Sequence, residues 1–535
     1  MIALKRFALL AIALVLLAVS NQLAQAGTFE DAVAGFAEGS YSQSEKAVAT
    51  IAASGNPLAY PIIQALQDGR LYADAAAGRV FIQTTDNKVI DAASGAAVAA
   101  LPATASAVRL NNRLRRSVEV ALGSLTLFSP DPALRIQAAQ TAFSNHDPAS
   151  LAPIDKALAN ETNADAKAAL TEARAAVLLF SPDASDADRV AALEVMRERG
   201  DQEALALVTN LPAGLSPAVA KVASNVASAI ERRLTIWSAV ESAWYGVSLG
   251  SVLLLAAIGL AITFGVMGVI NMAHGEMVMI GAYVTFVVQE IIRGSNPELF
   301  GYSLLIALPL AFLVAGAIGI VIERTVIRFL YGRPLETLLA TWGISLILQQ
   351  AVRTVFGPTN REVGNPSWMS GAFEFGQLTI TYNRLWTVVF AFAVFGVLLA
   401  MLRYTRFGLE MRAVTQNRRM AGSMGIAAAK VDALTFGLGS GIAGIAGVAL
   451  SQIDNVSPNL GQGYIIDSFM VVVFGGVGNL WGTLVGALTL GVANKFLEPV
   501  AGAVLGKIVI LILIILFIQK RPRGLFALRG RAVEA

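Results

Sequence analysis

Residue types that could do chemistry gather in one short segment of the chain. The run Asn271-Met272-Ala273-His274-Gly275-Glu276 places an amide, an imidazole and a carboxylate within two helical turns. Apolar residues stand on both sides, Val269-Ile270 before it and Met277-Val278 after it. Ionisable groups inside an apolar segment are costly, so they are usually functional. Two interpretations stay open: the three side chains line or gate a solute path, or they form a hydrogen-bonded structural knot at a helix break.

Uncharged polar groups occur in other apolar segments. Thr341, Ser345 and the pair Gln349-Gln350 offer hydroxyl and amide groups to a polar neutral solute, although the sequence does not fix which way they face. Asn479 follows a glycine-rich run, where an unwound turn is tolerated only beside protein or a cavity. The candidate path residues are Asn271, His274, Glu276, Thr341, Gln349 and Asn479, and the glycines expected at broken helices are Gly275, Gly475, Gly476, Gly478 and Gly482.

Enzymatic and metal chemistry has few residues to draw on. The chain has no cysteine and only two histidines, which excludes disulfides and thiolate chemistry and leaves almost nothing for a metal site or a Ser-His-Asp triad. Residues 501–508 are similar to a phosphate-binding loop, but Ala501 replaces its first glycine and Ile508 its Ser or Thr. We therefore expect a chain that is not an enzyme, binds no metal or cofactor and has no nucleotide-binding site.

Composition divides the chain into a polar first half and an apolar second half. Of the 535 residues 55% are hydrophobic and 14% charged, against roughly 25% charged in soluble domains. The net charge of +3 forms no basic patch, so no nucleic acid is expected as a partner. About nine membrane crossings are predicted, two of them short enough to be broken or re-entrant, at 243–264, 267–291, 303–323, 335–355, 384–403, 431–453, 465–480, 481–496 and 503–519.

Basic residues predict the orientation of these crossings. Arginines and lysines cluster at 324–333, 403–419 and 520–531, and such clusters favour the cytoplasmic side. At the amino terminus Lys5 and Arg6 precede the apolar run 7–19, and Ala24-Gln25-Ala26 offers small residues for cleavage, which is typical of an export signal. An exported start and a cytoplasmic end require an odd number of crossings, which nine satisfies.

The segment 403–426 has helical character and is long for a charged loop. It contains the sequence Arg-Tyr-Thr-Arg-Phe-Gly and ends in glycine. An ordinary loop that follows the distribution of positive charge is one interpretation, and a helix that docks on a partner protein is the other. The residues proposed to couple this segment to such a partner are Arg406, Gly408, Glu410, Arg412, Asn417 and Gly425.

The region after the export signal is predicted to be helical. Leu127-Phe128-Ser129-Pro130-Asp131 recurs as Leu179-Phe180-Ser181-Pro182-Asp183, and each copy leads into a segment with an arginine near its start. Ser, Asp and Pro favour helix starts. A short HEAT-like solenoid is favoured over a plain bundle. Residues 80–83 and 88–91 flank a polar turn and predict a β-hairpin inserted among the helices.

The whole chain is therefore expected to be all-α, a polytopic membrane protein preceded by a solenoid-like domain with a small β-hairpin. The predicted domains are a signal peptide at 1–26, an exported helical domain at 27–238, a transmembrane domain at 239–525 and a cytoplasmic tail at 526–535.

Several separated motifs resemble the LivH-like permeases of branched-chain amino acid-type ABC transporters. The resemblance rests on 271–276 followed by Gly281-Ala282-Tyr283, on 403–426, on Phe474 to Gly482, and on Pro522-Arg523-Gly524-Leu525. It covers about residues 244–525. It implies an inner-membrane complex with a second permease subunit, two ATPase subunits that use ATP and a periplasmic solute-binding protein. It also implies that 403–426 docks on the ATPase and that the exported domain is periplasmic.

The fused front domain narrows the resemblance to the urea-transporting branch of this family. Residues 111–115, Asn-Asn-Arg-Leu-Arg, are also similar to that branch. Urea is then the implied solute. Import of an amino acid or short amide by the same architecture is the nearest alternative. A self-sufficient channel or secondary transporter is a further alternative, in which uptake would not need an ATPase.

Overall fold

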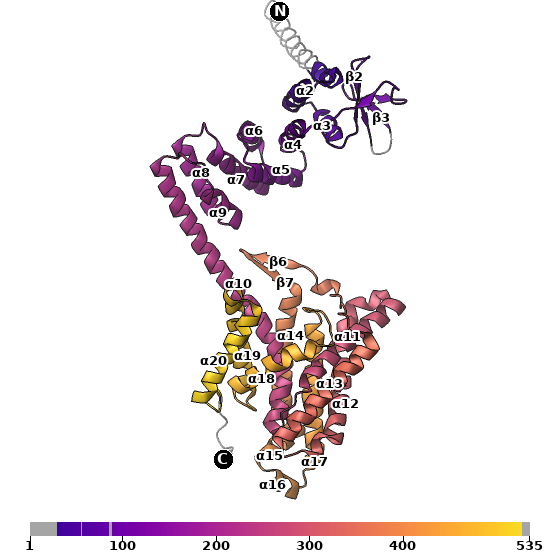
Figure 1. Cartoon of the computed structure of the whole chain (residues 1–535), viewed down its shortest axis with the longest axis vertical. Helices are drawn as coiled ribbons and strands as arrows, with labels where there is room; N and C mark the ends of the chain where they lie inside the picture. Colours follow the sequence, from indigo (N-terminus) through magenta and orange to yellow (C-terminus); the bar gives the residue numbers. More distant parts are fainter. Residues whose placement is uncertain (1–28, 55, 85–87, 527–535) are drawn as a thin grey trace, which may run out of the picture. The chain divides into compact units, whose positions relative to one another are not determined.

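The computed structural model describes residues 29–54, 56–84 and 88–526 (Figure 1). The chain divides into two compact units, Met1–Thr235 and Ile236–Ala535, so the boundary falls close to the one expected after residue 238. The predicted signal peptide and residues 527–535 of the predicted tail lie outside the described residues. Helices dominate both units, and the predicted fold class is confirmed.

The first part of unit 1 packs helices on a small sheet. The helices are η1 (Gly35–Glu38), α2 (Tyr41–Ala53) and α3 (Ala59–Gln67). The strands are β1 (Leu71–Asp74), β2 (Arg79–Gln83), β3 (Val89–Asp91), β4 (Ala97–Val98) and β5 (Ser106–Ala107), in the order β4-β3-β2-β1-β5. The predicted hairpin is present as the antiparallel pair β2–β3, in which Ile82 lies opposite Ile90. It is one part of a five-stranded sheet, because the short flanking strands carried no alternating pattern to mark them.

The rest of unit 1 is a succession of helices. They are α4 (Asn112–Thr126), α5 (Pro132–Asn145), η2 (Pro148–Ser150), α6 (Leu151–Asn160), α7 (Ala164–Phe180), α8 (Asp186–Arg199) and α9 (Gln202–Thr209). Most begin with a side-chain cap, as at Asn111, Asp131 and Asn163, whose oxygens accept backbone N–H bonds. Ala-rich faces such as that of α7 fill one continuous core.

The sequence repeat in unit 1 has a structural counterpart. Arg135 donates to the carbonyl of Ser129 at 2.8 Å, and Arg189 donates to the carbonyl of Ser181 at the same distance. The two helix starts differ, however. In the first copy Asp131 caps α5, as expected, whereas in the second α8 begins at Asp186 and Ser185 supplies the cap. Two more residues separate the serine from the arginine in the second copy, so its Ser-Pro-Asp lies in a loop.

Among the described residues of unit 2, eight helices are long and apolar enough to cross a membrane, with the end of α10 as the first. They are α10 (Pro217–Met267), α11 (His274–Ser295), α12 (Ser303–Thr325), α13 (Pro334–Phe356), α14 (Tyr382–Tyr404), α17 (Ala428–Leu450), α19 (Leu480–Ala501) and α20 (Ala503–Lys520). A shorter apolar helix, α18 (Leu460–Gly475), matches the segment predicted at 465–480. Each of the nine predicted crossings thus has a helical counterpart.

Glycines let α17 approach its neighbours closely. A Cβ on Gly447 would overlap the carbonyl oxygen of Val278 on α11, and one on Gly444 would lie 2.6 Å from that of Ala311 on α12. Small residues at such contacts allow backbone-to-backbone packing in lipid. The end of α10, α11 and α17 are the most buried membrane helices of unit 2, and α12 packs on α11 and α17, while α13, α14 and α20 leave most of their surfaces exposed.

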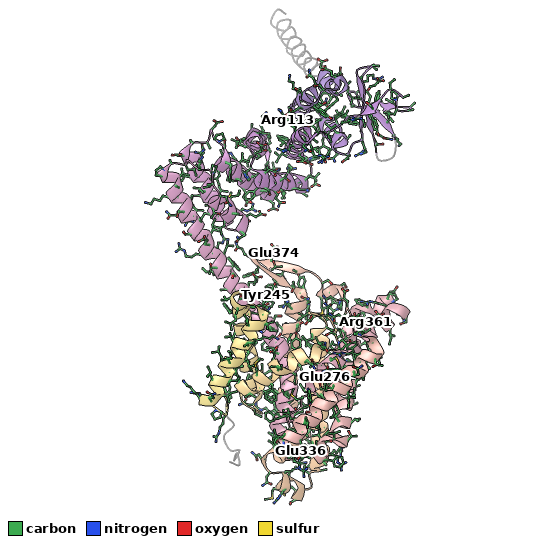
Figure 2. The ribbon with its side chains drawn as sticks, in the orientation of Figure 1. Arg113, Tyr245, Glu276, Glu336, Arg361 and Glu374 are labelled. Carbon is green, nitrogen blue, oxygen red and sulfur yellow. The ribbon has the colours of Figure 1, made fainter. Side chains whose placement is uncertain are left out.

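Connecting segments gather at two ends of unit 2 (Figure 1). One end carries η3 (Pro297–Tyr302), η5 (Ser367–Met369) and the hairpin β6 (Ala372–Phe375) to β7 (Leu378–Thr381). The other carries η4 (Ile327–Phe329), α15 (Arg406–Gln416) and α16 (Arg418–Ser423). In Figure 2 Arg361 and Glu336 mark the two ends and Glu276 lies between them.

Candidate functional site

One face of α13 is polar and buried. It is formed by four residues at every fourth position, Thr337, Thr341, Ser345 and Gln349. None of them is more than 5% exposed, whereas the apolar Leu339 and Ile347 of the same helix are 67% and 68% exposed. This is the reverse of an amphipathic helix in water. It suits a helix in lipid, where polar groups must find partners inside the protein.

Glu276 in the first turn of α11 meets this face. The hydroxyl of Ser345 donates to its Oε1 at 2.9 Å, and the Nε2 amide of Gln349 donates to the same oxygen at 2.7 Å. The Gln349 amide also donates to the Ser345 hydroxyl at 3.2 Å. Glu276 is 1% exposed. The three side chains form a closed hydrogen-bonded triangle that joins α11 to α13.

The chain between α10 and α11 is a turn held by side chains. Gly268 has a φ of +70°, which favours glycine, and ends α10. The Oδ1 of Asn271 accepts from the N–H of Ala273 at 3.0 Å, and the hydroxyl of Thr341 accepts from the N–H of Met272 at 3.1 Å. The helix break that the sequence suggested lies here. Two of its backbone donors, the N–H groups of Met272 and Ala273, are satisfied by these side chains.

His274 turns toward α10 and away from this triangle. Its Nε2 lies 2.9 Å from the carbonyl oxygen of Ala256. A carbonyl only accepts, so Nε2 carries the proton. The ring is 1% exposed and also lies against Gly259, where a Cβ would come within 2.7 Å of it. The imidazole therefore fills a fitted site between α10 and α11.

Asn271, Glu276, Thr341, Ser345 and Gln349 are called the polar seam below. The structure brings four of the six candidate path residues together in the seam, whereas His274 faces α10 and Asn479 lies at the turn between α18 and α19. Seam residues are no more than 5% exposed, and their hydrogen bonds go to one another or to the local backbone, whereas the Oε2 of Glu276 is buried and has no partner among the described residues. This is the geometry of the structural knot, the second of the two interpretations above.

Two contributors to this face were missed in the sequence, Thr337 and Arg353. Thr337 donates to the carbonyl of Arg333 at 2.8 Å and is 1% exposed, and Arg353 donates to Asn459 near the other end of α13. A signal was available. Residues 337, 341, 345, 349 and 353 are all polar and four apart, which places them along one helix face.

Asn479 and the glycines near it lie at a helix reversal. Gly475 ends α18 and faces Gly482 in the first turn of α19, and Gly476 and Gly478 have positive φ. The Oδ1 of Asn479 caps α19 by accepting from the N–H groups of residues 481 and 482. The structure thus places this run between two antiparallel helices that pack on each other. The predicted segments 465–480 and 481–496 correspond to these two helices, and the glycines expected at a helix break lie in and beside the turn that joins them.

Gly275 lies in the first turn of α11, and the break precedes it. A Cβ there would overlap the carbonyl oxygen of Gly461 on α18. The residue is thus glycine because two helices cross at this point. Gly268 supplies the positive φ expected at the break.

The segment predicted to dock on a partner forms α15 and α16. Gly408 is buried under the last turn of α14, where a Cβ would overlap the backbone of Leu402, and Arg412 donates to the carbonyl of Leu402. Asn417 caps α16 through the N–H of Met420 at 3.0 Å, and Gly425 follows with a φ of +88°. Arg406 is exposed and Glu410 half-buried. The large apolar side chains left exposed here are Tyr404, Leu409, Met420 and Met424.

Arg418 ties α16 to the helices of unit 2. Its guanidinium pairs with Asp432, which is fully buried at the start of α17. It also lies 5.0 Å from the ring centroid of Tyr331, whose hydroxyl donates to Glu323 on α12 at 2.7 Å. These contacts join α16 directly to α17 and, through Tyr331, indirectly to α12.

Unit 2 is the part of the chain that is similar to known proteins. Residues 242–518 match the family described as the permease component of the branched-chain amino acid transport system. The permease protein BraD of Pseudomonas aeruginosa is 32% identical over 287 residues, 52% of this chain and 93% of BraD. LivH of Escherichia coli is 31% identical over 54% of this chain and 94% of LivH. Both are named high-affinity branched-chain amino acid transport system permease proteins.

More distant similarity extends to a sugar permease. The ribose import permease protein RbsC of Escherichia coli is 29% identical over 36% of this chain and 61% of RbsC. No solved structure matches the chain at a significant level. The amino-acid permeases are thus matched over almost their whole length by about half of this chain.

Proposed function

Because the chain belongs to the family of branched-chain amino acid transport permease components, we propose that it is one membrane subunit of an ATP-driven importer of a small amide or amino-acid solute. It is a multi-pass protein of the bacterial inner membrane and a transport component. The observation that carries the proposal is the coincidence of two boundaries. The family match begins at residue 242 and ends at 518, and the membrane helices of unit 2 occupy the same part of the chain.

Urea is the first candidate for the solute, and branched-chain amino acids are the second. The relatives are named as amino-acid permeases, and nearly their whole length aligns with half of this chain. Unit 1 therefore has no counterpart in the aligned part of those relatives. That difference, with the sequence resemblance to the urea-transporting branch, supports a solute that differs from theirs. Urea is neutral, so hydroxyl, amide and carbonyl groups suit its path better than a charge clamp.

The energy is proposed to come from separate ATPase subunits that dock on α15 and α16. The exposed apolar side chains there, chiefly Leu409 and Met420, suit a protein contact more than water. The Arg418–Asp432 pair then conveys the motion of α16 to α17. The end of unit 2 with α15 and α16 would be cytoplasmic, and the end with β6 and β7 would be periplasmic, where a solute-binding protein delivers the solute. A second permease subunit completes the path.

The polar seam is proposed to hold α11 and α13 together during transport. Its hydrogen bonds fix the start of α11 against α13 while the helices move as bodies. Glu276 then organises the helix break and does not bind the solute. If Glu276→Gln left the complex assembled but abolished solute binding, this assignment would be wrong.

Uptake by the whole complex tests the proposal. The chain is co-expressed with the second permease, the two ATPases and the binding protein, and uptake of labelled urea and of labelled leucine is measured in a strain lacking its own transporters. ATP-dependent uptake of one solute is expected. Uptake that survives inactivation of both ATPases would instead identify a channel or secondary transporter. Comparing the uptake of labelled urea with that of labelled leucine decides which of the two is the solute.

A further inference from the structure

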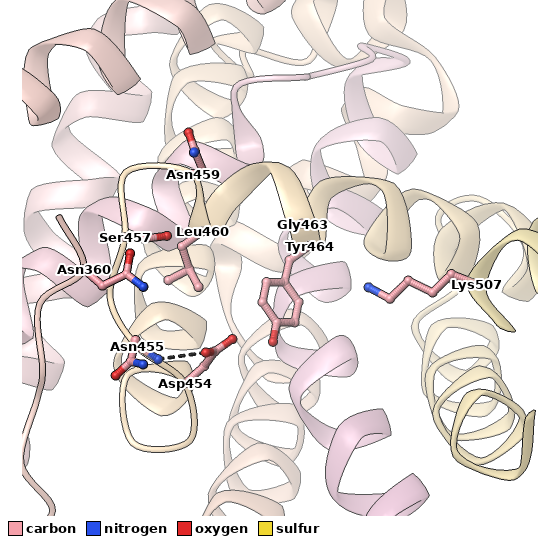
Figure 3. A pocket seen from close by; sticks show the side chains of 9 residues that line it. All are labelled: Asn360, Asp454, Asn455, Ser457, Asn459, Leu460, Gly463, Tyr464 and Lys507. Carbon is pink, nitrogen blue, oxygen red and sulfur yellow. Dashed lines mark hydrogen bonds between the residues drawn. The ribbon is translucent and has the colours of Figure 1, made fainter. Parts of the chain in front are cut away.

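A polar pocket of about 310 Å³ lies at the end of unit 2 that carries the long connecting segments (Figure 3). Its walls come from the segment after α13, the segment after α17, and the first turns of α18 and α20. The first two are joined where Arg361 and Val456 exchange backbone hydrogen bonds of 2.8 and 3.0 Å. The polar side chains that line it are Asn360, Asp454, Asn455, Ser457, Asn459, Tyr464 and Lys507.

Two charged side chains that line this pocket, Lys507 and Asp454, differ in their partners. Lys507 reaches toward Tyr464 from α20 in Figure 3, and its ammonium already pairs with Asp467 at 2.8 Å. Asp454 accepts the backbone N–H of Asn455 at 2.8 Å, and no ion pair to it is found within the described part of the chain. The pocket thus presents one free carboxylate among neutral amide and hydroxyl groups.

These groups define the chemistry of a ligand. The Asp454 carboxylate and the asparagine carbonyl oxygens accept hydrogen bonds, so they favour a solute rich in N–H donors. The amide N–H groups of the asparagines and the Tyr464 hydroxyl can donate to one carbonyl or carboxylate oxygen. Urea and an α-amino acid share this pattern of several N–H donors beside one oxygen acceptor. The volume lies at the lower end of the range for small-molecule sites.

The pocket is also connected to the polar seam. Arg353 in the last turn of α13 donates to the side-chain oxygen of Asn459 on the pocket wall. Gln349 lies one turn before Arg353 on the same helix and bonds to Glu276. A ligand that displaces the Asn459 side chain would therefore also act on α13, the helix that carries the buried polar face.

We propose that this pocket is the first binding subsite of the permease for its solute, and that it selects small solutes rich in N–H donors. The proposal rests on the proposed function and on the orientation given there, which places the pocket on the side where a binding protein delivers solute. Asp454 is the main acceptor, and Asn360 and Asn459 complete the site.

The test measures KM and kcat for uptake by the complete complex in proteoliposomes, with increasing concentrations of binding protein fully loaded with urea or with leucine. The variants are Asp454→Asn and Asn360→Ala. The control is Glu298→Gln, which removes an exposed carboxylate in η3 at the same end of the unit. ATPase activity without solute is recorded for every variant.

Asp454→Asn is expected to raise KM for urea by roughly three- to tenfold, since one hydrogen bond weakens. For leucine, whose ammonium would bond to a carboxylate, the rise is expected to exceed roughly tenfold. ATPase activity without solute stays unchanged, and Glu298→Gln behaves as wild type. Asn360→Ala raises KM by a smaller factor and provides the test should Asp454→Asn fail to assemble.

An unchanged KM in both pocket variants would overturn the proposal while leaving the transport function intact. A fall in kcat or in assembly with KM unchanged would overturn it too, because it would show a structural role only. Failure of the wild-type complex to take up either solute would refute the proposed function and this proposal with it.

Discussion

Replacing Gln349 by leucine removes the shorter of the two hydrogen bonds that the Glu276 carboxylate accepts. The two residues are 4% and 1% exposed, so water cannot take the place of the lost donor. A hydrogen bond to a charged group contributes about 1.5–3 kcal/mol. Side-chain hydrogen bonds between membrane helices average about 0.6 and reach about 1.7 kcal/mol. We therefore expect Gln349→Leu to lower the free energy of unfolding by about 1–2 kcal/mol.

The assay is reversible unfolding of the purified chain by SDS in mixed micelles, followed by circular dichroism. Gln350→Leu is the matched control, because Gln350 is the next residue on α13 and its side chain is exposed. Leucine on that face should be neutral or stabilising in an apolar environment. The two glutamines are chemically identical, so the difference between the variants isolates the buried hydrogen bond.

A double-mutant cycle with Glu276→Leu decides whether the pair itself is responsible. Without the carboxylate the Gln349 amide is left buried with only the 3.2 Å bond to Ser345. The cost of Gln349→Leu should then fall to near zero or change sign. Costs that add within about 0.3–0.5 kcal/mol would show that the two residues act independently and would refute the seam as a coupled unit.

Three further results are expected. Gly408→Ala should lower the free energy of unfolding by about 1–3 kcal/mol, because its Cβ has no room beneath α14. The same variant should reduce uptake more than ATP hydrolysis. Gly422→Ala, in the open α16, is the control and should change neither uptake nor hydrolysis. Arg418→Ala should lower Tm and uncouple ATP hydrolysis from uptake. Its loss of unfolding free energy should be less than the roughly 3–5 kcal/mol of a fully buried ion pair, because the arginine is half exposed. Normal coupling in this variant would rule out the proposed route from α16 to α17. The Arg135 guanidinium lowers the pKa of Glu161 to about 2, below its ordinary 4.5, so the stability from this pair is complete above pH 4.5 and is lost as pH falls toward 2. The Tm difference between wild type and Glu161→Gln should shrink over that window, and a constant difference would contradict the pairing.

The helix content and the places of the crossings could be predicted from the sequence. Apolar runs of about twenty residues cannot remain in water, and in lipid a single segment satisfies its backbone only as a helix. This physical constraint is local, so it acts on each segment regardless of its neighbours. The nine predicted segments accordingly correspond to α10 to α14 and α17 to α20, with α15 and α16 in the charged segment between them.

Glycine-rich runs were harder to interpret, since glycine permits both a close helix contact and a reversal of the chain. The runs at 437–447 and 475–482 have similar composition. The first packs inside α17 and the second turns α18 into α19. What separates them is the backbone conformation, because Gly476 and Gly478 have positive φ whereas the glycines of the first run are helical.

The sequence alone determined that this chain has an apolar half built of membrane helices, that its interior carries buried polar residues and that it resembles ABC permeases. It could not decide the facing of Gln349 against Gln350, because adjacent residues on a helix point about 100° apart and either can face the protein. The tertiary structure decided it by placing Glu276 opposite α13. The same holds for the pocket around Asp454, whose walls come from segments spread between residues 360 and 507 and meet only when the helices pack.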